Sequence, residues 1–167
     1  LVELPRGDFA QTVLRNFVLA TFLKLLWQRL LGSGDAELAA IAGKAVKEAR
    51  YHQQHAGDWV LRLGGGTDES LRRLQAAVLA LWPYVPEMFE ADAVDEQALR
   101  LGLGPRWADL QAEWMTEVAP VLREAGIEAP AVRAFRSTGK QGVHSEHMGY
   151  ILAEMQYLQR SHPGGVW

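Results

Sequence analysis

Hydrophobic residues recur every three or four positions along most of this sequence, which is the spacing of one face of an α-helix. A first helix is expected over residues 9–31, after the N-cap residue Asp8 and before the glycines at positions 32 and 34. At about 100° per residue, its large side chains cover nearly the whole circumference, and only a narrow polar margin with Lys24 and Gln28 remains. We therefore expect this helix at the centre of a bundle, or buried against another chain or a further segment.

The same spacing predicts four more helices, and no stretch alternates as a strand would. They are expected over residues 35–63, about 68–89 after the cap Thr67, about 105–125, and about 144–160. Pro83 and Pro86 are expected to kink the third helix and Pro120 to disturb the fourth. Residues 91–104 are expected to be loosely structured, and residues 127–142 to form a long connection. The sequence predicts an all-α helical bundle of about five helices, with one domain over residues 1–167.

Composition and charge exclude several classes of function. The absence of cysteine excludes disulfides, thiolate zinc sites and thiol nucleophiles, and it fits a reducing compartment, so we expect a cytoplasmic protein. The 17 basic and 20 acidic residues are scattered along the chain, which leaves no basic stripe for nucleic acid. We expect no membrane partner either, because charged residues interrupt a first helix whose apolar run is shorter than the ~20 residues of a span.

The segment AVKEARYHQQH places Glu48, Tyr51, His52 and His55 within little more than two helical turns. Di-iron sites of ferritin-like bundles take a Glu from each of two helices and a Glu-x-x-His pair from each of the other two. None of the five histidines has a glutamate three residues before it, and Tyr51 stands where the partner of Glu48 would be. Two interpretations of Glu48 and His52 stay open. They form a residual metal or acid/base pair, or, as we favour, His52 is a partly buried histidine satisfied by Glu48 or a backbone carbonyl.

The last predicted helix carries a second group of candidate side chains. His144 and His147 lie one turn apart, and such a pair binds zinc when a third ligand approaches. Glu154 lies two turns from His147, which is too far for one ion, so we favour packing at the helix start or a contact between subunits, with His144 or Ser145 near the N-cap. Five residues are candidates for structural or partner-interface roles: His55, His144, Glu146, His147 and Glu154. No residue is assigned as catalytic, cofactor-binding or metal-binding.

Long stretches that together cover almost the whole chain resemble one family. They are LVELPRGDFA, LAAIAGKAVKEARYH, DWVLRLGGGTDES, and GKQGVHSEHMGYILAEMQYLQR with PGGVW. The sequence is similar to the C subunits of the bacterial phenylacetyl-CoA 1,2-epoxidase, the ring-1,2-phenylacetyl-CoA epoxidase of aerobic phenylacetate catabolism. The resemblance implies a ferritin-like fold and a non-catalytic role that scaffolds and stabilises a homologous A subunit, which holds the di-iron centre and the CoA ester. It also implies a bridging B subunit and a separate reductase that delivers electrons from NADPH, while a second copy of this chain is a further candidate partner.

The sequence also departs from the family. Family members carry a further N-terminal helical segment ahead of the position matching Leu1, so we expect a truncated version of a longer subunit, which would explain the apolar circumference of the first helix. Pro83 and Pro86 are unusual for the family. One alternative hypothesis is an autonomous ferritin-like metal-dependent oxidoreductase that uses Glu48, His52 and a carboxylate of the fourth helix, Glu113 or Glu117. Another is a free-standing bundle that binds a small molecule.

Overall fold

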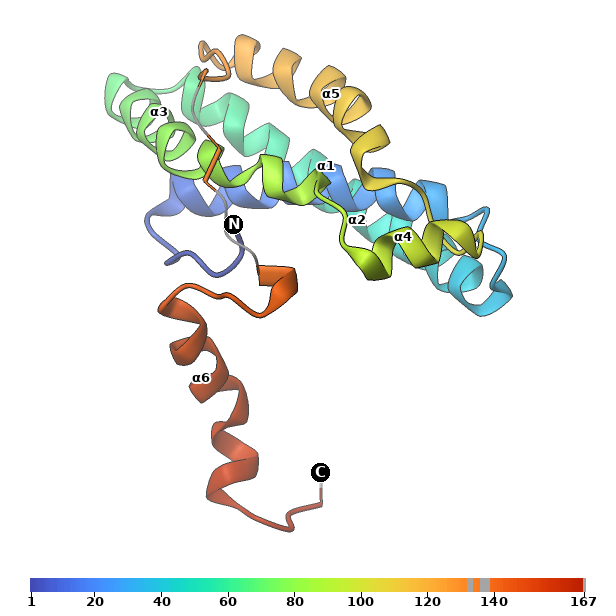
Figure 1. Cartoon of the computed structure of the whole chain (residues 1–167). Coiled ribbons are helices and arrows are strands. Elements are labelled where there is room, and N and C mark those ends of the chain that lie inside the picture. The colour runs from blue at the N-terminus through green and yellow to red at the C-terminus, as the bar shows by residue number, and fades with distance from the viewer. Residues whose placement is uncertain (132–133, 136–138, 167) are drawn as a thin grey trace.

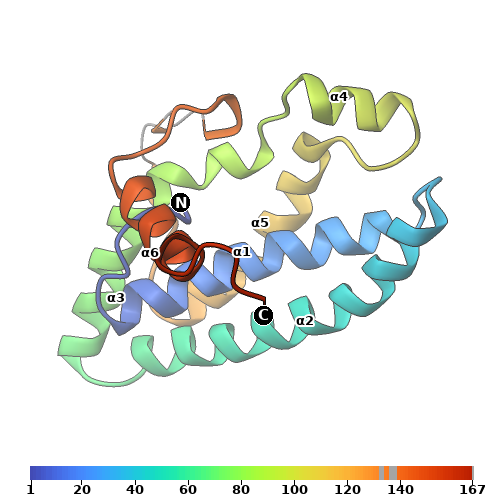
Figure 2. The same ribbon diagram turned by 90° about the horizontal axis from the view of Figure 1, so that it is seen from below.

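The computed structural model describes residues 1–131, 134–135 and 139–166, and within them it contains six α-helices and no strand. Helices α1 (Phe9–Leu30) and α2 (Ala36–Gly64) run antiparallel side by side, while α3 (Asp68–Leu81) and α5 (Leu110–Glu124) also pack against α1 (Figures 1 and 2). The short α4 (Ala93–Arg100) follows α3, and α6 (His147–Ser161) comes last. Four 3₁₀-helices lie between them: Trp82–Tyr84, Pro86–Phe89, Trp107–Asp109 and Gly139–Gln141. The all-α prediction is confirmed, with one helix more than expected.

Helix α1 is the central helix of the bundle. Its large side chains point toward three neighbouring helices, and Leu14, Phe17, Val18 and Leu25 are each at most 2% exposed. The predicted polar margin is wrong at Lys24, which is buried. Among the described residues, α1 is also the one helix long and apolar enough to span a membrane, and 56% of that apolar window is buried inside the fold, as in the core helix of a globular domain.

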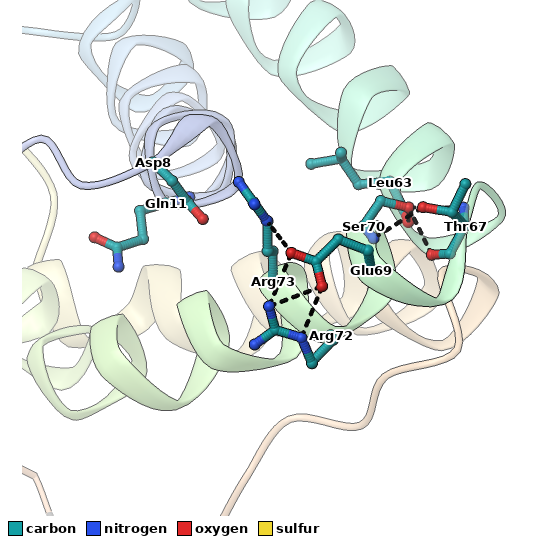
Figure 3. A network of polar contacts seen from close by, with 8 residues as sticks. All are labelled: Asp8, Gln11, Leu63, Thr67, Glu69, Ser70, Arg72 and Arg73. Carbon is teal, nitrogen blue, oxygen red and sulfur yellow. Dashed lines mark hydrogen bonds and ion pairs between the residues drawn. The ribbon is translucent and has the colours of Figure 1, made fainter.

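The starts of α1 and α3 are capped by the residues that the sequence predicts. The Asp8 carboxylate accepts a hydrogen bond of 3.0 Å from the backbone N–H of Gln11 at the start of α1. At the start of α3, Thr67 and Ser70 form a reciprocal capping box with bonds of 2.9 and 3.1 Å. The Ser70 hydroxyl also donates to the Leu63 carbonyl at 2.7 Å (Figure 3). This bond ties the start of α3 to the end of α2, so the direction of the turn between them is fixed.

The prolines end the third helix earlier than expected. Helix α3 stops at Leu81, and Pro83 and Pro86 lie at the first turns of the two 3₁₀-helices that follow. The segment expected to be loosely structured contains α4, which begins with a capping box between Asp92 and Asp95. Pro120 lies inside α5 without ending it.

The ends of α2 and α5 approach closely at one glycine. A Cβ atom added at Gly64 would lie 2.3 Å from the carbonyl oxygen of Ala125, a distance that no side chain tolerates. Glycine is therefore required at this contact, which brings the two helix ends together.

Helix α6 projects away from the bundle and contains no buried residue (Figure 1). Its exposed apolar side chains are Tyr150, Leu152, Met155, Tyr157 and Leu158. No described segment covers them, so this helix presents an apolar surface to its surroundings.

Candidate functional site

The candidate residues of α2 lie together on its exposed side. Glu48, Tyr51, His52 and His55 are all exposed. The ring of Tyr51 lies 5.6 Å from that of His52 and stacks on that of His55 at 5.9 Å, with an interplanar angle of 17°. The prediction of a partly buried His52 is wrong, and the structure shows no hydrogen bond between Glu48 and His52, both of which it describes. His55, a candidate for a structural or partner-interface role, is exposed in this structure.

The error at His52 follows from where the buried face of α2 is centred. The buried residues of this helix are Ala42, Val46, Ala49, Ala56, Gly57 and Val60. At about 100° per residue, His52 lies about 85° from the centre of this set. Ile41, an apolar residue on nearly the same side of the helix as His52, is itself 56% exposed. The polar residue at the centre of the buried face is Gln53, which helical geometry could have identified.

Gln53 belongs to a polar cluster that joins α1, α2 and α5 inside the bundle. The Lys24 ammonium forms an ion pair with the Glu117 carboxylate. The Gln53 amide donates to the same carboxylate oxygen at 2.6 Å and to the Thr21 hydroxyl oxygen at 3.2 Å. The Thr21 hydroxyl in turn donates to the Phe17 carbonyl at 2.8 Å. Each of these four side chains therefore has a hydrogen-bond or ion-pair partner, as buried polar groups require.

The carboxylates proposed for a metal site on α5 are engaged by cations of α1. Glu117 is paired with Lys24, and Glu113 accepts a bond of 2.6 Å from Arg29 on the surface. Glu48 and His52 lie on the exposed side of α2. The structure does not bring these four side chains together into the set that the oxidoreductase hypothesis requires.

A ferritin-type ligand set does not fit the residues present in this chain. Such a set needs carboxylates and histidines that converge from several helices. Within residues 1–131, 134–135 and 139–166, no three side chains of His, Asp or Glu gather as metal ligands would. The third position after Glu48 is the phenol of Tyr51, a poor substitute for an imidazole ligand.

The candidate histidines near α6 have a different role. The Nδ1–H of His144 donates to the Glu3 carboxylate at 2.7 Å, and the backbone N–H and hydroxyl of Ser145 donate to its other oxygen at 2.8 and 2.9 Å. The hydrogen bond from His144 is the main cause that lowers the pKa of Glu3 to about 2. These bonds fix residues 3 and 144–145 to each other, and α6 begins at His147, three residues later than the expected helix start.

The remaining candidates lie on α6 itself or at its first turn. Glu146 occupies the N-cap position without a side-chain capping bond, His147 is half-buried, and Glu154 is exposed. His144 and His147 both line a surface cavity of about 560 Å³ near the start of the chain. Sequence reasoning did not find this cavity, because its wall combines segments that lie far apart in the chain.

Comparison with known proteins places this geometry in a family. A family model described as "Phenylacetic acid catabolic protein" matches residues 1–167. The chain is 44% identical over 167 residues to the C subunit of the 1,2-phenylacetyl-CoA epoxidase of Escherichia coli (strain K12), and the match covers 100% of this chain and 67% of that protein. The all-α architecture is the ferritin-like fold of this family. The chain therefore belongs to the phenylacetic acid catabolic protein family.

Proposed function

We propose that this chain is a non-catalytic structural subunit of a multicomponent phenylacetyl-CoA 1,2-epoxidase in the cytoplasm. In this proposal it scaffolds and stabilises a homologous catalytic subunit, which holds the di-iron centre and the CoA ester. The assembly also includes a bridging subunit, and a reductase supplies electrons from NADPH. The relative that is 44% identical is named as one subunit of such an epoxidase, which supports a place in a multisubunit complex.

The observation that carries the non-catalytic role is the pair Glu48 and Tyr51. Two of the four helices of a ferritin-type site carry a histidine three residues after the glutamate, whereas this helix has a tyrosine there, whose ring stacks on His55. The carboxylate that does enter the bundle, Glu117, is neutralised by Lys24. Both features suit a ferritin-like helix bundle in which a lysine, in place of a metal ion, balances the charge of an interior carboxylate.

The exposed surface of α6 supports the role in assembly. Tyr150, Met155 and Tyr157 are each more than two-thirds exposed on a helix that no described segment covers. Aromatic residues and methionine are enriched at protein interfaces. We therefore include α6 in the contact with the catalytic subunit.

The test is reconstitution with the catalytic subunit. The two subunits are expressed together and purified through a tag on the catalytic one, and oxygenation of phenylacetyl-CoA is measured with the reductase and NADPH, with and without this chain. We expect turnover to depend on the chain and to survive Glu48→Ala and His52→Ala. Met155→Glu should weaken co-purification, because it places a charge in the apolar contact. The control is Leu79→Glu, which introduces the same charge at an apolar position 60% exposed on α3.

Iron analysis of the isolated chain distinguishes this proposal from an autonomous oxidoreductase. Stoichiometric iron that is lost on Glu48→Ala would contradict the proposal. So would loss of turnover in a Glu48→Ala complex that still assembles with the correct stoichiometry.

A further inference from the structure

The cavity near the start of the chain is formed by several separate parts of the fold. Its floor is made by α1 and the 3₁₀ segments around Met88 and Trp107, and its walls by the first four residues, Tyr84 with Phe135, and residues 139–147. The guanidinium of Arg15 holds the first segment in place by donating to the carbonyls of Leu4 and Pro5 at 3.0 and 2.6 Å. At about 560 Å³, the cavity lies within the range of small-molecule sites, ~300–1,000 Å³.

The floor of the cavity is apolar and rich in aromatic rings. Phe22 and Trp107 lie against each other with ring centroids 5.3 Å apart, and Leu19 and Met88 line the cavity beside them. On another wall, the rings of Tyr84 and Phe135 are 4.9 Å apart. A flat ring packs well here, because aromatic groups prefer edge and offset contacts and methionine adapts its shape to such a ligand.

The rim of the cavity is held by hydrogen bonds and ion pairs. The Lys140 ammonium lies 3.5 Å from the centroid of the Trp107 ring, and it donates to the Asp95 carboxylate at 2.6 Å and to the Glu90 carbonyl at 3.0 Å. Opposite it, Glu3 accepts bonds from the segment at 144–145. The rim is thus fixed at two points, so the cavity exists before a ligand arrives.

The charges on the rim disfavour an anion. Among its described side chains are the carboxylates of Glu3 and Glu146 and one ammonium, that of Lys140, which is already paired with Asp95. A carboxylate or phosphate placed here would meet like charges, and no lysine other than Lys140 is among the described residues that line the cavity.

We propose that this cavity is a binding site for a neutral, ring-bearing apolar molecule of one or two fused rings. The rings occupy the floor between Leu19 and Trp107, and a polar group of the ligand faces the acidic rim. The inference does not depend on the proposed function, because it concerns a different surface from the apolar side of α6 and requires no turnover.

The test compares two probes that share a ring system and differ in charge. Indole-3-acetamide is neutral and indole-3-acetate is an anion at pH 7.5. A ligand of about 13 non-hydrogen atoms at ordinary efficiency binds with a Kd of about 1 mM or tighter. We expect saturable binding of the amide in this range by isothermal titration and saturation-transfer NMR, and at least threefold weaker binding of the acid.

Variants of the lining decide whether the signal comes from this cavity. Leu19→Trp and Met88→Trp fill the floor and should weaken amide binding at least tenfold, while Leu79→Trp, at a site 60% exposed on α3, should leave it unchanged. Glu146→Gln removes a rim charge at an exposed position, and it should reduce the preference for the amide over the acid without repacking the floor.

Three outcomes would overturn the inference. One is the absence of saturable amide binding by the folded wild-type chain. Another is equal affinity for the two probes in the wild type. The third is unchanged binding in both filled variants when circular dichroism shows them folded. If Leu19→Trp and Met88→Trp do not fold, Glu146→Gln still tests the inference. An unchanged preference of this variant for the amide over the acid contradicts the proposed charge selectivity.

Discussion

Replacing Lys24 by methionine should destabilise the bundle, because it leaves the Glu117 carboxylate in the interior without its cation. The Lys24 side chain is 11% exposed and that of Glu117 is 28% exposed. Removing one partner of a fully buried pair costs about 3–5 kcal/mol. Since water still reaches part of Glu117, we expect a loss of about 2–3 kcal/mol, which corresponds to a fall in Tm of about 5–10 °C for a chain of this size.

A double variant shows whether the loss of stability comes from the unpaired charge or from lost packing. In Lys24→Met/Glu117→Leu both charges are gone, and buried pairs can often be replaced by apolar side chains at little cost. We expect the double variant to lie within about 1 kcal/mol of the wild type, with the remaining cost due to the Gln53 amide that loses its acceptor. The control is Arg29→Met, because the Arg29–Glu113 pair is exposed on both sides (52% and 42%) and should contribute less than about 1 kcal/mol.

The assay is urea unfolding followed by circular dichroism at 222 nm, with the four corners of a double-mutant cycle measured at one pH and ionic strength. The coupling energy between Lys24 and Glu117 should exceed about 1.5 kcal/mol. The reasoning is refuted if Lys24→Met costs no more than Arg29→Met, or if the double variant loses the sum of the two single losses.

The other predictions concern a buried hydrogen bond, a contact between two helix ends, and the acid-sensitive contact of Glu3 with His144 and Ser145. Trp114→Phe should cost about 2 kcal/mol in urea unfolding, because the buried indole N–H donates to a carbonyl of α1 at 2.9 Å and the smaller ring loses this bond and leaves part of the indole's volume empty. Gly64→Ala should cost about 1–3 kcal/mol of stability, because its Cβ would overlap Ala125. Gly149→Ala is the control, because a Cβ there meets nothing within 4 Å, and it should raise stability by about 0.5–1 kcal/mol. Equal effects of the two substitutions would contradict the packing argument. Because the pKa of Glu3 is lowered from 4.5 to about 2 in the fold, its contribution to stability is complete above pH 4.5 and is lost as the pH falls toward 2. Glu3→Gln should therefore reduce the dependence of the free energy of unfolding on pH between pH 2 and 4.5. An unchanged dependence in this range would exclude a stabilising contact of Glu3 with His144 and Ser145.

The fold could be predicted because its helices are long, periodic and capped by short-range signals. Asp8 and Thr67 accept bonds from the N–H groups three residues later, so the sequence alone locates these helix starts. Helix α4 was missed because its eight residues show no sustained period. Its capping box between Asp92 and Asp95 was the local signal that could have revealed it.

The candidate site was predicted less well, because burial depends on which side of a helix its neighbours occupy. His52 was expected to be partly buried, whereas the packing of α1 and α5 places Gln53 on the inward side of α2 and leaves His52 exposed. Lys24 looked like a surface residue until α5, far along the chain, supplied Glu117. The cavity depends on contacts such as Glu3 to His144, which are separated by 141 residues, and no local pattern encodes such a distance.

The central position of α1 has a consequence for synthesis of the chain. Val18 on α1 receives its hydrogen bond from Trp114, a residue 96 positions later. At about 5–20 residues per second, the ribosome needs roughly 5–20 s to deliver that partner. During this interval a helix with the hydropathy of a membrane span lacks its contacts with α5. We therefore expect the yield of the chain in cells to depend on chaperones more than its final stability suggests.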